Sequence, residues 1–110
     1  MNQVQLIGNL TKDVECKAVS TGDLVARFSL AVNRGKDHVD FINCEAWGKL
    51  ADNINQFCKK GSKIAVTGAI RVDSYEKDGE KRTYYYKVNC FSVEFLSKKE
   101  LKEDKISSDF

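Results

Sequence analysis

The sequence of 110 residues predicts one all-β domain, a five-stranded Greek-key barrel that contains a single short helix. Three observations lead to this prediction. Five stretches are predicted as strands: those at 4–10, 24–33 and 63–75 alternate apolar and polar residues at the two-residue period, 39–47 has one core face, and 83–96 is rich in β-forming residues. One stretch between the third and fourth strands has the period of an amphipathic helix. Gly68 interrupts the long fourth strand, where a bend or bulge forms easily.

The first two strands are expected at residues 4–10 and 24–33, because apolar side chains occupy every second position of each. The first strand bends at T-K-D, residues 11–13, and resumes at 14–19. Ile7 lies on the otherwise polar face of the first strand. Since an unpaired sheet edge invites pairing, this strand is the predicted seam between two copies of the chain.

The third strand, residues 39–47, carries large side chains on both faces. Ile42, Cys44 and Ala46 form the predicted core face. The opposite face holds Phe41, Asn43, Glu45 and Trp47. Aromatic rings beside polar groups indicate a surface that something covers, and this stretch alone leaves open whether a ligand or another protein layer does so.

The helix is predicted at residues 49–58, followed by Gly61 as the left-handed residue that ends it. The fourth strand, 63–75, and the fifth, 83–96, are joined by a hairpin whose tip contains Asp78 and Gly79, residues that tolerate positive φ. From residue 97 the pattern dissolves. The domain is therefore expected at 1–96 and a flexible tail at 97–110.

This order of elements is typical of the oligonucleotide- and oligosaccharide-binding (OB) barrel. A small β-sandwich is the alternative, but it gives the helix no natural role. The OB-fold serves several ligand classes, so the side chains have to indicate the function.

Composition argues against several functions. The chain has no apolar run long enough to span a membrane and no signal segment, so we expect a cytoplasmic protein. Its four cysteines are scattered and it has one His, which predicts buried thiols and neither a metal site nor a cofactor. No nucleophile motif or phosphate cradle is present, and Asp37, Asp40 and Glu45 are interpreted as solvated surface charges. We therefore expect no catalytic residues and no enzyme.

The aromatic and basic residues fit a binder of single-stranded nucleic acid. Such a protein needs flat rings for stacking bases and cations for the phosphates. The candidate stacking residues are Phe41, Trp47 and Tyr75. The candidate phosphate contacts are Arg34, Lys36, Lys49, Lys63 and Arg71. A second hypothesis is an interaction module whose aromatic face binds a protein partner.

At these residues the chain closely resembles the bacterial and phage single-stranded DNA-binding protein family over about residues 1–96. The matching blocks are M-N-Q-V-Q-L-I-G-N-L-T-K-D at 1–13, F-S-L-A-V-N-R at 28–34, D-F-I-N-C-E-A-W-G-K-L-A at 40–51, K-K-G-S-K-I-A-V-T-G-A-I-R at 59–71 and S-Y-E-K-D-G at 74–79. The resemblance implies an OB-fold, usually a homotetramer in bacteria, that wraps single-stranded DNA without sequence preference during replication, recombination and repair.

The resemblance also implies roles for individual residues. The family's stacking positions fall on Phe41, Trp47 and Tyr75. Its basic positions fall on Lys49, Lys60, Arg34 and Arg71.

The chain departs from the family pattern in two places. The loop at 34–38 is short and has no aromatic residue, so one stacking contact of longer-looped relatives is missing. The tail lacks a long Gly-, Pro- and Gln-rich linker, and only Asp109 and Phe110 resemble the acidic tip through which relatives recruit replication and repair proteins.

Overall fold

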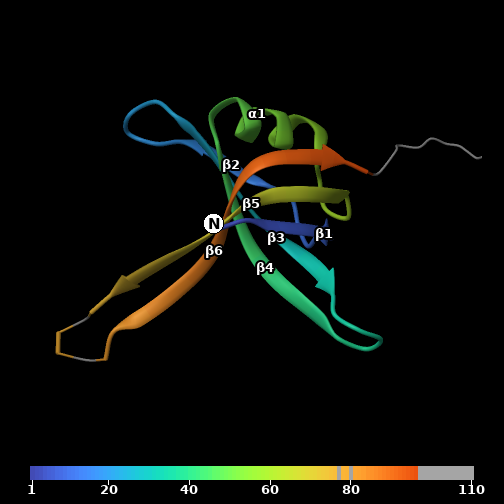
Figure 1. Ribbon diagram of the computed structural model, residues 1–110. Helices are drawn as coiled ribbons and strands as arrows, with labels where there is room; N and C mark the ends of the chain where they lie inside the picture. The colour runs from blue at the N-terminus through green and yellow to red at the C-terminus, as the bar shows by residue number, and fades with distance from the viewer. Residues whose placement is uncertain (77, 80, 97–110) are drawn as a thin grey trace, which may run out of the picture.

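The computed structural model describes residues 1–76, 78–79 and 81–96. Within them it has six strands and one helix (Figure 1). These elements are β1 (Val4–Leu10), β2 (Glu15–Ala18), β3 (Leu24–Asn33), β4 (Val39–Trp47), α1 (Gly48–Phe57), β5 (Lys63–Tyr75) and β6 (Thr83–Phe95). The predicted tail, residues 97–110, lies outside the described residues.

The strands form one sheet in the order β1-β5-β6-β4-β3-β2, and an additional β1–β3 pairing closes it into a barrel. That closing pairing joins Asn9 to Ala31 and Leu10 to Leu30. β1 and β2 pair with the same strand, β3, so together they are the single bent strand that the sequence predicts. The barrel therefore has five strands in this sense, and the predicted OB-fold is confirmed.

The alternating apolar residues fill the barrel. Its largest fully buried side chains are Leu30, Ile54, Ile64, Val25 and Val66. Cys44 and Ala46 of β4 are buried as predicted, while Ile42 is half-buried. Helix α1 lies across one end of the barrel and buries Ala51 and Ile54 in the core (Figure 1). The helix thus closes the barrel end with its apolar stripe.

Gly68 marks the predicted irregularity. Thr67 pairs with Ser92 but Gly68 pairs with Cys90, so Phe91 is an extra residue and the bulge is on β6. A Cβ atom at Gly68 would collide with the carbonyl oxygen of Asn89 and lie 2.9 Å from its carbonyl carbon. Only glycine lets the two strands approach this closely.

Two local predictions need correction. Helix α1 starts and ends one residue earlier than expected, with Trp47 as its N-cap and Cys58 as its C-cap. Gly61 has the expected positive φ of 90°, but it lies three residues beyond that C-cap. It belongs to the turn in which the Ser62 N–H donates to the Lys59 carbonyl, at 2.9 Å. At the hairpin tip, Asp78 and Gly79 have positive φ as predicted.

Two hairpins extend beyond the barrel. In Figure 1 the β3–β4 and β5–β6 hairpins diverge on the side away from α1, like two arms. The described strands of the second arm pair as far as Tyr75 with Thr83. These two arms carry most of the candidate binding residues.

Candidate functional site

The outer face of β4 holds the aromatic residues that the sequence singled out. Phe41 and Trp47 are 69% and 43% exposed. Their register partners on β3 are Ala31 and Val25, and between them Glu45 lies opposite Arg27. The alternation along β4 therefore places Phe41, Glu45 and Trp47 on one side of the sheet.

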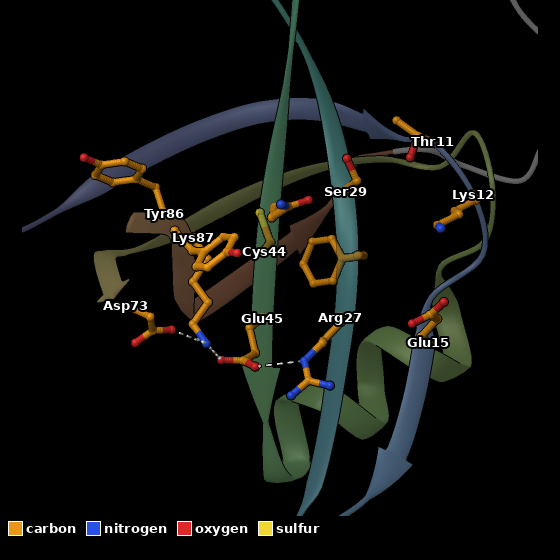
Figure 2. Close-up of a pocket in the computed structure, with 13 residues that line it drawn as sticks. Thr11, Lys12, Glu15, Arg27, Ser29, Cys44, Glu45, Asp73, Tyr86 and Lys87 are labelled. Atoms are coloured by element: carbon orange, nitrogen blue, oxygen red, sulfur yellow. Dashed lines mark hydrogen bonds and ion pairs between the residues drawn. The ribbon is translucent and has the colours of Figure 1, made fainter. Parts of the chain in front are cut away.

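A chain of ion pairs joins this face to the second arm. Arg27 Nε lies 3.1 Å from Glu45 Oε2, and Lys87 Nζ lies 2.9 Å from Glu45 Oε1. Lys87 Nζ also lies 3.3 Å from Asp73 Oδ2. Figure 2 shows these contacts running from Asp73 through Lys87 and Glu45 to Arg27. This row of ion pairs crosses β5, β6, β4 and β3. The side of these four strands that carries the ion pairs is called the outer face below.

Glu45 is buried, which contradicts the prediction that it is a solvated surface charge. Only 4% of the residue is exposed. Burial raises the pKa of its carboxyl group, but hydrogen bonds from Lys87 and Arg27 outweigh that effect and the pKa falls below its ordinary value. The bond to Glu45 in turn raises the pKa of Lys87. Of the other two acids in that interpretation, Asp37 is exposed, whereas Asp40 is half-buried beside Arg34.

A groove of about 680 Å³ follows the ion pairs, within the usual range for ligand sites of about 300–1,000 Å³. β4 contributes Asn43 and Glu45, which Phe41 and Trp47 flank along the strand. The whole lining is Thr11, Lys12, Glu15, Arg27, Phe28, Ser29, Asn43, Cys44, Glu45, Asp73, Tyr85, Tyr86 and Lys87. Charged groups of both signs and aromatic rings thus meet in one open site.

Tyr75 is 49% exposed and does not stand alone. Its ring lies almost parallel to that of Tyr85, with centroids 5.7 Å apart and planes 10° apart. The Tyr85 hydroxyl donates to the Tyr75 hydroxyl at 3.2 Å, and this bond raises the pKa of Tyr85. The two rings therefore form one stacked pair on the second arm.

The predicted cations separate into two groups. Arg71 lies directly opposite Lys87 in the β5–β6 register, and Lys49 is exposed two residues after Trp47. Lys36 is exposed in the 34–38 loop, where Arg34 Nε lies 3.1 Å from both carboxylate oxygens of Asp40. These four lie near the aromatic residues in the sequence or the sheet.

Lys60 and Lys63 form the second group, which lies away from the arms; none of the six predicted cations lines the groove itself. Lys63 opens β5 opposite Asn9 of β1. Eight residues of strand, about 26 Å, separate it from Arg71. Lys60 is in the turn after α1, where its backbone N–H donates to Asp13. The structure does not bring these two lysines to the outer face of the arms.

Sequence reasoning missed Arg27, Lys87 and Tyr85. Nothing in the sequence pairs Arg27 with Glu45, because the two residues are on different strands. Tyr85 lies in a run of three tyrosines, residues 84–86, of which alternation puts one or two on the side of Tyr75. Only the hairpin register decides which, and it selects Tyr85.

Two searches of the described residues concern metal-ligand clusters and membrane-spanning helices. Among them, no three His, Cys, Asp or Glu side chains are grouped so as to hold a metal ion. None of their helices is long and apolar enough to cross a membrane. All four cysteines are unpaired; Cys44, Cys58 and Cys90 are buried and Cys16 is half-buried.

Comparison with known proteins assigns the family. The model of the single-strand binding protein family matches residues 1–96. The chain belongs to this family. It is 48% identical over 99 residues to the single-stranded DNA-binding protein of Clostridium perfringens, 42% over 106 to single-stranded DNA-binding protein 3 of Listeria innocua, and 42% over 106 to single-stranded DNA-binding protein 1 of Streptococcus pyogenes.

These matches include 87%, 91% and 91% of the chain, respectively. The chain spans 66% of the Clostridium and Listeria proteins, just under two thirds of their length, and 82% of the Streptococcus protein. Family membership agrees with the expectation that the protein is not an enzyme, since the family is defined by single-strand binding.

Proposed function

We propose that this protein binds and protects single-stranded DNA without sequence preference. The observation that carries the proposal is the outer face, where exposed Phe41, Trp47 and Tyr75 on β4 and β5 share one side of the sheet with cations on β3, β5 and β6. The names of these three relatives, each a single-stranded DNA-binding protein, support the same ligand.

Bases stack on the exposed rings. Stacking on an aromatic side chain contributes about 1–3 kcal/mol per base and tolerates any base, because every base has a π-face. Phe41 and Trp47 are six residues apart on β4, about 20 Å of strand, so one stretch of DNA can contact both ends of the groove. This arrangement explains binding without base-specific hydrogen bonds.

Phosphates contact the neighbouring cations. Lys49 follows Trp47 by two residues and Arg71 lies opposite Lys87, and Arg27 and Lys87 supply further cations on the outer face. Arg27 uses Nε for Glu45, which leaves its two terminal nitrogens for a phosphate. Lys36 and Arg34 contact DNA phosphates at the end of the first arm. Lys60 and Lys63 contact phosphates only where the DNA continues around the barrel.

The biological role in this proposal is protection of single strands during replication, recombination and repair, in the cytoplasm, by a homotetramer. In the described register, Val4–Gly8 of β1 pair only with β5, and Ile7 is 56% exposed. This free edge supports pairing between copies. Recruitment of replication and repair proteins falls to Asp109 and Phe110, which lie outside the described residues.

One observation favours the rival function, a protein-interaction module. A second groove of about 440 Å³ lies between the arms and is mostly apolar. Phe41 lines it together with Val4, Leu6, Ile42, Asn43, Ile70, Tyr86, Lys87 and Val88. Another protein chain on this groove would cover Phe41 in place of a base.

Substitution of Phe41 by Ala distinguishes the two functions, with Phe57→Ala as the matched control. Phe57 is 66% exposed, close to the 69% of Phe41, but it ends α1 and packs on Phe95 with ring centroids 5.8 Å apart. Phe41→Ala is expected to weaken oligo-dT binding about 5- to 150-fold, while Phe57→Ala leaves it unchanged. Light scattering, which measures the state of assembly, supplies the second readout. If Phe41→Ala breaks the assembly but leaves DNA binding intact, the interaction module is supported.

A further inference from the structure

We propose that Tyr85 is a fourth base-stacking residue, which forms with Tyr75 a two-ring platform that takes a base on each side. This inference rests on the proposed function, and it concerns a residue that the sequence did not single out.

The hairpin register places both tyrosines on the outer face. Tyr75 pairs with Thr83 and Tyr85 pairs with Asp73, so the two tyrosines are diagonal neighbours across the β5–β6 arm. Lys87 lies two residues after Tyr85 on the same side of β6, and it bonds to Glu45 of β4. Tyr85 is therefore on the face that carries Phe41 and Trp47.

The rings keep free surface although they contact each other. Their nearly parallel planes, 10° apart, leave Tyr75 49% and Tyr85 51% exposed. An aromatic pair of this kind contributes only about 0.5–1.5 kcal/mol beyond its buried area. Stability of the arm alone therefore does not account for two tyrosine rings that stay half exposed. Each ring has one face against its partner and one face available to a base.

Tyr85 borders the groove and Tyr75 does not. One side of its ring lies against Tyr75, and Tyr85 borders the groove together with Asp73 and Lys87. A base stacked there has Lys87 and Arg27 at hand for its phosphates. A base on the far side of Tyr75 continues the strand along the arm.

The sheet order gives Tyr85 a particular place. β6 lies between β4 and β5. None of the three stacking residues predicted from the sequence is on β6, because Phe41 and Trp47 are on β4 and Tyr75 is on β5. Tyr85 is on β6, so with it the stacking residues lie on three neighbouring strands, and DNA can cross the sheet along them.

Photochemical cross-linking tests the contact directly. The full chain is irradiated with oligo-dT that carries 5-iododeoxyuridine, and the linked residues are mapped by mass spectrometry. The inference requires an adduct at Tyr85. Adducts at Trp47 or Tyr75 with none at Tyr85 overturn the inference and leave the proposed function intact. Absence of any complex with oligo-dT overturns the proposed function itself.

Affinity of matched variants separates stacking from support of Tyr75. Tyr85→Ala is expected to weaken oligo-dT binding about 5- to 150-fold. Tyr85→Phe keeps the ring, loses the bond to the Tyr75 hydroxyl, and is expected to bind within about twofold of the original protein. The control is Tyr84→Ala, since Tyr84 is 55% exposed on the opposite side of β6.

Two results overturn the inference. One is a Tyr85→Phe variant as weak as Tyr85→Ala, because the hydroxyl that positions Tyr75 would then account for the effect. The other is equal loss in Tyr84→Ala, which would indicate damage to the arm. Circular dichroism of each variant checks that the barrel is folded.

Discussion

Replacing Glu45 by Gln removes the charge at the centre of the outer face and keeps the shape of the side chain. In the original protein the carboxylate accepts from Lys87 at 2.9 Å and from Arg27 at 3.1 Å. A hydrogen bond to a charged group contributes about 1.5–3 kcal/mol when buried, whereas exposed ion pairs contribute about 0–1 kcal/mol. The Glu45 side chain is 6% exposed, but those of Arg27 and Lys87 are 50% and 30% exposed. We therefore expect a loss of about 1–2 kcal/mol in the free energy of unfolding.

The assay is urea unfolding of both proteins at several pH values. Because the pKa of Glu45 in the folded protein is below its ordinary value of 4.5, the charged form is favoured by folding. The stabilisation is complete above the pKa of the unfolded chain and is lost as the pH falls through the folded pKa. The difference between original and Glu45→Gln protein should thus be full at about pH 7 and shrink below about pH 4.

Glu15→Gln is the matched control for this experiment. Glu15 lies opposite Arg27 on the other neighbouring strand, β2, and lines the same groove, but it is exposed. The same change of charge there should leave stability within about 0.5 kcal/mol. Equal stability of Glu45→Gln and the original protein at neutral pH would refute the reasoning, as would a difference that persists unchanged in acid.

Two further predictions concern the barrel. Gly68→Ala is expected to lower the free energy of unfolding by about 1–3 kcal/mol, because the backbone of Asn89 and Cys90 must move to admit the new methyl group; an unchanged thermal melting curve would contradict this. Ile54→Ala removes a side chain of zero exposure from the core and should cost about 2–5 kcal/mol in urea unfolding. Its neighbour Asn55 is exposed, so Asn55→Ala should stay within about 0.5 kcal/mol, and similar losses in both variants would contradict the assigned core.

The fold could be predicted because its information is local. Strand β3 has apolar residues at every second position, and the change to helical period after Trp47 marks α1. Gly68 signalled a bulge for the same reason, although the extra residue, Phe91, is on the partner strand. The extra residue is assigned to β6 by the pairing register of β5 with β6. The alternation of apolar residues alone does not determine a register.

The candidate site depends on contacts between distant segments, so only part of it could be predicted from the sequence. Glu45 was interpreted as solvated because its partners, Arg27 and Lys87, are on two other strands. Lys63 and Arg71 are both predicted phosphate contacts on β5, but the length of that strand separates them. The stacking and phosphate roles of all these residues stay predictions.

Quenching of Trp47 fluorescence by oligo-dT, followed as salt is added, tests single-stranded DNA binding at the outer face. Trp47 is the one tryptophan of the chain, so the signal reports on the outer face alone. We predict quenching at low salt. The logarithm of the binding constant should fall with the logarithm of the salt concentration, with a slope of about −0.7 per phosphate contacted. If Arg27, Lys49, Arg71 and Lys87 each contact one phosphate, the slope is about −3. Unquenched fluorescence at low salt, or binding that ignores salt, would contradict single-stranded DNA binding at this face.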